Sequence, residues 1–283
     1  MAAMSARVAT RRLVNSLFVG FCIAVTAIAL LALATILFTL VKNGAGNLGI
    51  DLFIKSVPPQ GEHGGLADGI VGSIMMCTLG MAIALLVGIL AGTWLAEYAG
   101  DSRYGAVVRF LNDVLLSAPS ILIGVFVAQL LVTNVIHHPS GYAGSVALAL
   151  LAIPVIIRTT EDVLRLQPIS LRESGIALGT PFWTVIRRII WRASASGIVT
   201  GALLAFARIS GETAPLIFTA LGNNNRSFDM YRAMSALPLS IYSLTTGSAD
   251  QVSLAWTGAL LISGAVLAIT IIARVLSQEQ KRE

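Results

Sequence analysis

The sequence has 283 residues, of which 56% are hydrophobic and only 12% carry a charge, and its mean hydropathy is +0.83. Soluble domains carry about a quarter charged residues, so this composition excludes an ordinary water-soluble globule. The net charge of +5 does not indicate nucleic-acid binding, because the basic residues stand at the ends of long apolar runs rather than in one stripe. The composition therefore predicts an all-α protein that crosses a membrane several times.

Six apolar runs are candidates for membrane-spanning helices. A span needs about 20 mostly apolar residues, because the hydrocarbon core is about 30 Å thick and each helical residue advances about 1.5 Å. The runs lack the alternation of barrel strands, so helices are expected. Residues 13–275 should form one six-span bundle between cytoplasmic segments 1–12 and 276–283. The predicted spans are Leu13–Val41, Leu66–Ala96, Gly105–Val132, Tyr142–Ile157, Ala193–Leu221 and Leu254–Val275.

Glycines four residues apart occur in two of these spans: Gly88 with Gly92, and Gly197 with Gly201. Small residues at this spacing let helix backbones approach closely in lipid, where no hydrophobic force drives helices together. Both pairs predict tight helix–helix contacts and require no further function.

The distribution of Lys and Arg predicts the orientation. If the N-terminus is cytoplasmic, fourteen of the 19 basic residues fall on the cytoplasmic side and four fall outside. Cytoplasmic loops are enriched in Lys and Arg, so both termini and the segment 158–192 are expected in the cytoplasm. The one remaining basic residue, Arg208, lies inside the fifth span.

Charged residues inside the fifth span are candidates for function. Arg208 and Glu212 are four residues apart, so on a continuous helix they would share a face and pair. Each charge costs about 2.5–3.5 kcal/mol at the bilayer centre, so the pair should face protein or a water-filled path. Gly211 and Pro215 loosen the helix beside them and could free backbone groups to line a pathway. A buried ion pair that only fixes the packing is the structural alternative.

A second candidate pair lies near the cytoplasmic start of the third span. Arg109 and Asp113 are also four apart, and a pair that anchors the helix at the membrane surface is the simplest interpretation. Asp113 is followed by Pro119, so the pair could instead line an inner vestibule. His137 and His138 have no carboxylate at ligand spacing, and no metal site is expected.

The cytoplasmic segment from Arg172 to Arg192 contains a helix–turn–helix pattern. A first short helix should end at Gly179, and Thr180 with Pro181 should begin a second in cap-then-proline order. A solvated connector would not explain five large apolar residues in this loop. They are Ile176, Leu178, Phe182, Trp183 and Ile186. The pattern predicts a two-helix knob that enters a cleft on a partner.

This segment resembles the E-A-A-x-x-x-G-x9-I-x-L-P coupling loop of ATP-binding-cassette importer permeases with the MetI-like fold. The matching residues are Glu173, Ser174, Gly175, Gly179 and Ile189. At the end of the motif this chain has Trp191 for the leucine and Arg192 for the proline. The resemblance implies that these residues couple the chain to an ATPase.

A second resemblance concerns the substrate. The run from Arg208 through Ser210, Glu212 and Thr213 to Leu216 is similar to R-A-x-G-E-T-A-P-L in the PstA family of phosphate permeases. It implies that Arg208, Ser210, Glu212 and Thr213 contribute to phosphate translocation. The planar guanidinium of arginine also matches phosphate oxygens on physical grounds.

The resemblance implies a membrane complex with several partners in the plasma (inner) membrane. They are a PstC-like permease, a PstB-like ATPase dimer and an external PstS-like phosphate-binding protein. No Walker-type loop occurs in the sequence, so ATP and Mg²⁺ would be bound by the partner ATPase, and this chain is expected to be non-catalytic without a cofactor of its own. The alternatives are a proton-coupled anion transporter that uses Arg208 and Glu212, and a purely structural membrane scaffold.

Overall fold

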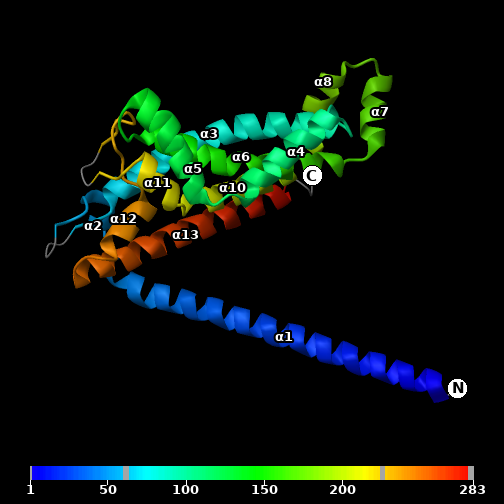
Figure 1. The fold of residues 1–283 in the computed structure, drawn as a ribbon, viewed down its shortest axis with the longest axis horizontal. Helices are drawn as coiled ribbons and strands as arrows, with labels where there is room; N and C mark the ends of the chain where they lie inside the picture. Colours follow the sequence, from blue (N-terminus) through cyan, green and yellow to red (C-terminus); the bar gives the residue numbers. More distant parts are fainter. Residues whose placement is uncertain (1, 60–63, 224–226, 280–283) are drawn as a thin grey trace.

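The computed structural model describes residues 2–59, 64–223 and 227–279, with side chains placed from residue 11 to residue 272 of these ranges. All secondary-structure elements of the described chain are helices, apart from a single isolated bridge that joins Leu221 to Met234 (Figure 1). The long helices are α1 (Ala2–Gly44), α3 (Ala67–Glu97), α4 (Arg103–Ser117), α6 (Gly141–Arg165), α10 (Ala195–Ser210) and α13 (Ala249–Glu279). The short ones are η1 (Ala45–Asn47), α2 (Asp51–Ile54), α5 (Ser120–Val127), η2 (Ala128–Ile136), α7 (Ile169–Ala177), α8 (Phe182–Val185), η3 (Ile186–Ile190), α9 (Trp191–Ala193), α11 (Ala214–Thr219) and α12 (Leu237–Leu244).

The centre of the bundle is the contact of α6 with α3 and α10. A methyl group added to Gly88 would lie 2.7 Å from Ile156 Cβ on α6, far inside normal contact distance. Gly92 lies equally close to α6, and on α10 Gly197 and Gly201 lie against α6 side chains. Both predicted glycine pairs are therefore confirmed as close helix–helix contacts.

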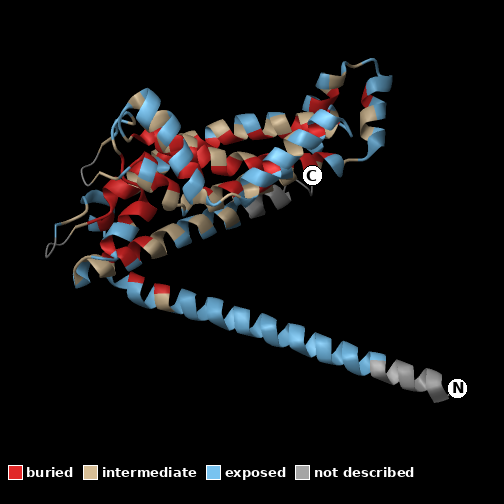
Figure 2. Cartoon of the chain, in the orientation of Figure 1, coloured by how far each residue is buried: buried red, intermediate tan, exposed pale blue. Residues whose placement is uncertain are grey.

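Four helices in the described residues are long and apolar enough to cross a membrane, and two bent helix pairs bring the possible total to six. The four are α1, α3, α6 and α13, which match the predicted first, second, fourth and sixth spans, with α3 beginning one residue later than predicted. The predicted all-α membrane bundle is confirmed. Where α1 leaves the bundle in Figure 2, its surface is exposed, as expected for a helix that meets lipid or another subunit.

The third and fifth predicted spans are wrong as single helices. Instead of one helix over Gly105–Val132, α4 and the α5–η2 unit meet at an angle of 104°. The bend follows from Pro119, which forces extended backbone on Ala118 and cannot donate a helical hydrogen bond. The segment predicted as Ala193–Leu221 begins beside a 72° bend between α9 and α10, and α10 ends at Ser210 before α11 starts.

The two ends of the bundle have different elements. Helices α7 and α8 lie at the same end of the molecule as the start of α1 and the end of α13. Helices α2, α11 and α12 lie at the other end (Figure 1). This arrangement agrees with the prediction that both termini and the segment 158–192 share one side of the membrane. Most of the predicted terminal segments, 1–12 and 276–283, lies outside the residues whose side chains are described.

Candidate functional site

The first candidate site is the break between α10 and α11. The final residue of α10 is Ser210, and Gly211, Glu212 and Thr213 form the link before α11. Pro215 stands at the start of α11, where its fixed φ suits a helix and its missing N–H leaves no bond unmade. On the opposite side Gly124 of α5 approaches Pro215 so closely that no side chain would fit between them. The break is therefore held in place by packing.

The predicted ion pair between Arg208 and Glu212 is not formed. Because α10 stops at Ser210, Glu212 has left the helix, and the four-residue spacing no longer places the two side chains on one face. Both residues are half-buried. Within the described part of the chain, neither side chain makes a hydrogen bond or an ion pair. Arg208 is thus a partly desolvated cation without an internal counter-ion among these residues.

A cleft of about 400 Å³ lies beside the break, between the end of α10 and the middle of α13. Ser210 at the end of α10 and Gly211 just after it line one side, and Ser263 and Thr270 line it from α13. Of these, only Ser210 is a predicted translocation residue. The sequence does carry a signal for the other two hydroxyls, because polar side chains inside an apolar span often line a pathway or a helix contact. Glu212 and Thr213 are adjacent in the chain but do not line this cleft.

The second candidate site is the hairpin formed by α7 and α8. Gly179 has φ +73°, the left-handed conformation that commonly follows a helix, so the predicted helix end at this glycine is confirmed. The second helix starts one residue later than predicted, because Pro181 is the N-cap of α8 rather than its first residue. An added methyl group on Gly175 would lie 2.8 Å from Val185, so this glycine lets α7 pack against α8.

The residues that match the coupling motif divide into two groups. Gly175 and Ile189 face the interior of the hairpin, where the buried side chains of Val185 and Ile190 form its core. By contrast Glu173, Ser174 and Gly179 are exposed. Two large apolar side chains accompany them on the surface, Ile176 and Leu178, the latter 83% exposed. An exposed apolar tip on a firmly packed hairpin is what a partner's cleft could hold.

Arg172 attaches the hairpin to the bundle. Its guanidinium donates two hydrogen bonds to Glu97 at the end of α3, of 2.8 Å from Nε and 2.6 Å from Nη2. Further bonds of 2.8 and 2.9 Å go to the backbone carbonyls of Leu164 and Gln167 at the end of α6. The hydrogen bond with Glu97 raises the pKa of Arg172 above its ordinary value. Side-chain exposure is 16% for Arg172 and 2% for Glu97, so this is a buried, bidentate ion pair.

Residues 84–282, which include both the helix break and the hairpin, match the family of binding-protein-dependent transport system inner membrane components. The chain belongs to that family. Among curated relatives, the phosphate transport system permease protein PstA of Haemophilus influenzae is 48% identical over 272 residues, which cover 96% of each chain. PstA of Yersinia pestis is 45% identical over 275 residues, covering 96% of this chain and 93% of the relative.

Solved structures show the same fold at low sequence identity. Two inward-facing structures of the MetNI methionine ABC transporter superpose with TM-scores of 0.61 and 0.62 at 17% and 16% identity. They cover 77% and 76% of this chain and 94% and 95% of the matched chains. The predicted family and the MetI-like permease fold are therefore confirmed, and the permease is a multi-pass membrane subunit of a binding-protein-dependent transport system.

The predicted pair of Arg109 with Asp113 is wrong. Arg109 of the permease donates instead to Glu161 on α6 at 2.7 Å, and to the carbonyls of Leu95 and Gly100 at the end of α3. Helix α4 crosses α6, so a carboxylate 52 residues away is closer than the one in the next turn. Asp113 lies 4.0 Å from Arg158. Arg109 of α4 thus connects three helices, α3, α4 and α6. These contacts give no support to the prediction that it lines an inner vestibule.

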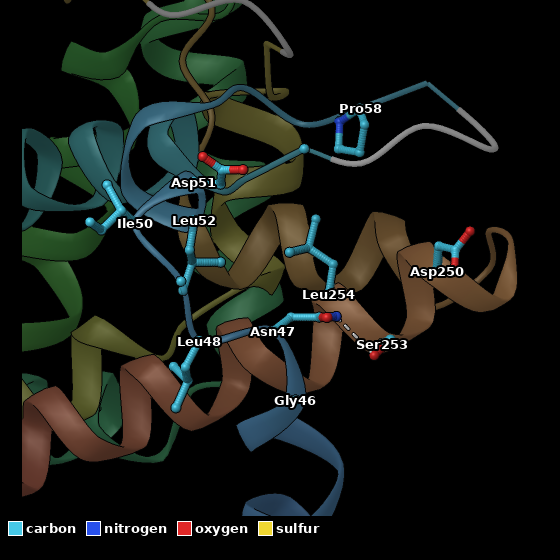
Figure 3. Close-up of a pocket in the computed structure, with 12 residues that line it drawn as sticks. Gly46, Asn47, Leu48, Ile50, Asp51, Leu52, Pro58, Asp250, Ser253 and Leu254 are labelled. Carbon is cyan, nitrogen blue, oxygen red and sulfur yellow. Dashed lines mark hydrogen bonds between the residues drawn. The ribbon is translucent and has the colours of Figure 1, made fainter.

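A cavity of about 500 Å³ lies at the end of the permease opposite to the hairpin, between η1, α2 and the start of α13 (Figure 3). Its lining includes two carboxylates, Asp51 and Asp250, and a hydrogen bond from Asn47 to Ser253 joins its two sides at 3.0 Å. Lys55 already pairs with Asp51 at 2.7 Å. With Asp51 paired, Asp250 remains as an acidic group, and the described lining includes no basic side chain that would attract an anion, so the cavity does not suit a phosphate site.

Proposed function

We propose that this chain is the permease subunit of an ATP-driven phosphate importer. The carrying observation is its similarity to PstA permeases over nearly the full length of both chains, in a fold with an exposed coupling hairpin. Its partners would be a PstC-like permease, a PstB-like ATPase dimer and a PstS-like binding protein. ATP and Mg²⁺ would belong to the ATPase, and this chain would carry out no catalysis and bind no cofactor.

Arg208 is the residue that would meet phosphate. It stands 13 residues into α10, about 20 Å along the helix axis. With Ala195 at the cytoplasmic edge of a hydrocarbon core about 30 Å thick, Arg208 would lie past its midpoint. A charge at such depth costs about 2.5–3.5 kcal/mol unless an opposite charge or water compensates it. Phosphate would supply that compensation through paired, charge-assisted hydrogen bonds to the guanidinium. Because no described residue pairs with Arg208, its guanidinium N–H groups are available to donate to phosphate.

Glu212 and the hydroxyl groups would complete the path. The carboxylate four positions after Arg208 would keep the empty pathway near neutrality and oppose tight binding, which favours release. Ser210 and Thr213 flank the break and offer hydroxyls that replace part of the hydration shell of the anion. The cleft that contains Ser210 opens beside α13, where a second permease could close it.

The hairpin would connect transport to ATP hydrolysis. With both termini and the segment 158–192 in the cytoplasm, Ile176 and Leu178 would enter a cleft of the ATPase. Glu173, Ser174 and Gly179 would contact the same cleft from the exposed side of the turn. Gly175 and Ile189 would support these contacts from inside by keeping the two short helices together.

Transport by the four-component complex in lipid vesicles tests the proposal. We expect uptake of labelled phosphate with ATP and loaded binding protein, and none with a proton gradient alone. Uptake driven by the gradient without ATP would instead support a proton-coupled transporter, which the family assignment disfavours. Arg208→Gln should nearly abolish uptake while the complex assembles and hydrolyses ATP. Arg208→Lys should rescue it only in part, since an ammonium lacks the planar fork.

A further inference from the structure

The C-terminal end of α3 makes three contacts with the hairpin and the residues that follow it, from α7 to α9. The bidentate pair of Arg172 with Glu97 is the first. A second is the hydrogen bond of 3.1 Å from Trp191 Nε1 to Thr93 Oγ1, whose residue is buried. The third is the edge-to-face contact of Phe182 with Tyr98, with ring centroids 5.5 Å apart. All three contacts fall within the last two turns of α3 or directly after it.

The other end of α3 is attached just as firmly to α12. Ser73 Oγ accepts a hydrogen bond of 2.7 Å from the backbone N–H of Leu237, the first residue of α12. Gly72 meets the backbone of Ser235 just before α12, and Gly69 lies against Ser240 and the backbone of Leu237, so the two glycines let α12 pack closely on this face. The buried side chains of Ser235 and Ser240 also bond to each other at 2.8 Å.

Helix α3, which carries both attachments, is continuous over its 31 residues, about 46 Å, with neither a proline nor a break. Its contact with α6 runs along its length through Gly80, Gly88 and Gly92. A regular helix packed this closely moves as a unit rather than bending, because packed interiors transmit displacement. The two spans that contain α4 and α10 are bent or broken, and they are not continuous rods of this kind.

We propose that α3 is the lever that carries the motion of the hairpin to the opposite end of the permease, and that Arg172 with Glu97 is the latch between the two. The inference rests on the proposed importer function, since it assigns a route to the coupling between ATPase and pathway. Arg172 and Glu97 are positioning residues: they contact no substrate, and their buried, fully bonded pair makes the hairpin and α3 move together. The same guanidinium also donates to two backbone carbonyls at the end of α6, which fix the position of the Arg172 side chain beside Glu97.

The test compares Glu97→Gln and Arg172→Lys with Asp162→Asn, in vesicles that contain the whole complex. Asp162 also pairs with an arginine at this end, Arg158, but both side chains are about half exposed, so its loss should matter little. The measured quantities are the ATPase retained per permease and the phosphate moved per ATP hydrolysed. We expect both latch variants to keep the ATPase and to lower phosphate per ATP about fivefold or more, the range of typical coupling energies. Asp162→Asn should leave the ratio unchanged.

A variant at the far end of α3 separates a lever from a simple anchor. Ser73→Ala removes the bond to Leu237 at the end opposite to the ATPase, and it should also lower phosphate per ATP while ATPase binding stays normal. If uptake falls only in proportion to the amount of complex, with an unchanged ratio in Arg172→Lys and Ser73→Ala, the lever is refuted. Failure of the wild-type complex to move phosphate would refute the importer function instead.

Discussion

Gly179 is the position where the hairpin can be tested with the smallest change. Its φ of +73° lies in the left-handed region, and nothing stands within 4 Å of the place where a β-carbon would be. A side chain there therefore meets no atom of the described chain, and the cost inside the permease is conformational alone. For residues other than glycine this cost is about 1–2 kcal/mol, which disfavours the native turn by about fivefold to thirtyfold.

Alanine and asparagine at position 179 distinguish two reasons for a glycine there: its left-handed backbone conformation and its small size in the ATPase cleft. Asparagine tolerates the left-handed region, whereas alanine does not, yet asparagine is the larger residue. If the backbone conformation limits function, Gly179→Ala should lower ATP-driven uptake severalfold and Gly179→Asn should stay near the wild-type rate. If contact with the ATPase cleft limits function, the order should reverse. Gly179→Leu combines both defects and should abolish uptake and weaken ATPase binding with normal membrane insertion.

The assay is phosphate uptake in vesicles, with ATPase retained per permease measured on the same preparations. Full uptake by Gly179→Leu with the ATPase still attached would refute the reasoning, since it would make the hairpin a simple connector. Equal rates for the alanine and asparagine variants, both at the wild-type level, would show that neither the turn nor the cleft is sensitive at this position.

Two further predictions concern topology and the Arg109 contact. Single cysteines at Leu178 and Phe228, both strongly exposed, should react from opposite sides of the membrane, with residue 178 reached only from the cytoplasm; labelling of both from outside intact cells would overturn the orientation. Arg109→Ala should lower stability by about 3 kcal/mol, the low end for breaking a buried pair, because Arg165 still contacts Glu161. Asp113→Asn should leave the thermal midpoint nearly unchanged, and equal losses in both variants would contradict the contact with Glu161.

The parts of the fold that were predictable from sequence depend on local rules. Continuous apolar runs of sufficient length located the four unbroken spans, and the four-residue glycine spacing of Gly88 and Gly92 identified a real helix contact. The turn at Gly179 follows from the conformational freedom of glycine, which is a property of one residue. The break near Ala118 was not predicted, because apolar residues lie on both sides of it and a hydropathy average does not register a change of direction. After Ser210 the residues Gly211 and Pro215 indicated a loosened helix, but not that the helix ends there.

Charge partners were the least predictable feature. The four-residue rule describes two side chains on one isolated helix, and it failed for Arg109 because a crossing helix offered Glu161. The pair of Arg172 with Glu97 joins residues 75 apart, and only the tertiary fold brings them together. Such partners become visible in a sequence only when the packing of the helices is already known.

Three arginines of this permease nevertheless differ in the counter-ions and carbonyl acceptors that the fold places around them. Arg109 and Arg172 each receive a nearly buried glutamate and backbone carbonyls, as expected where a buried charge must be compensated inside the chain. Arg208 is half-buried deep in the fifth span and receives neither from the described residues. Arg208 therefore differs from the two structural arginines in the contacts that the described residues give it. Under the proposed function, a phosphate anion would supply the compensating charge during transport.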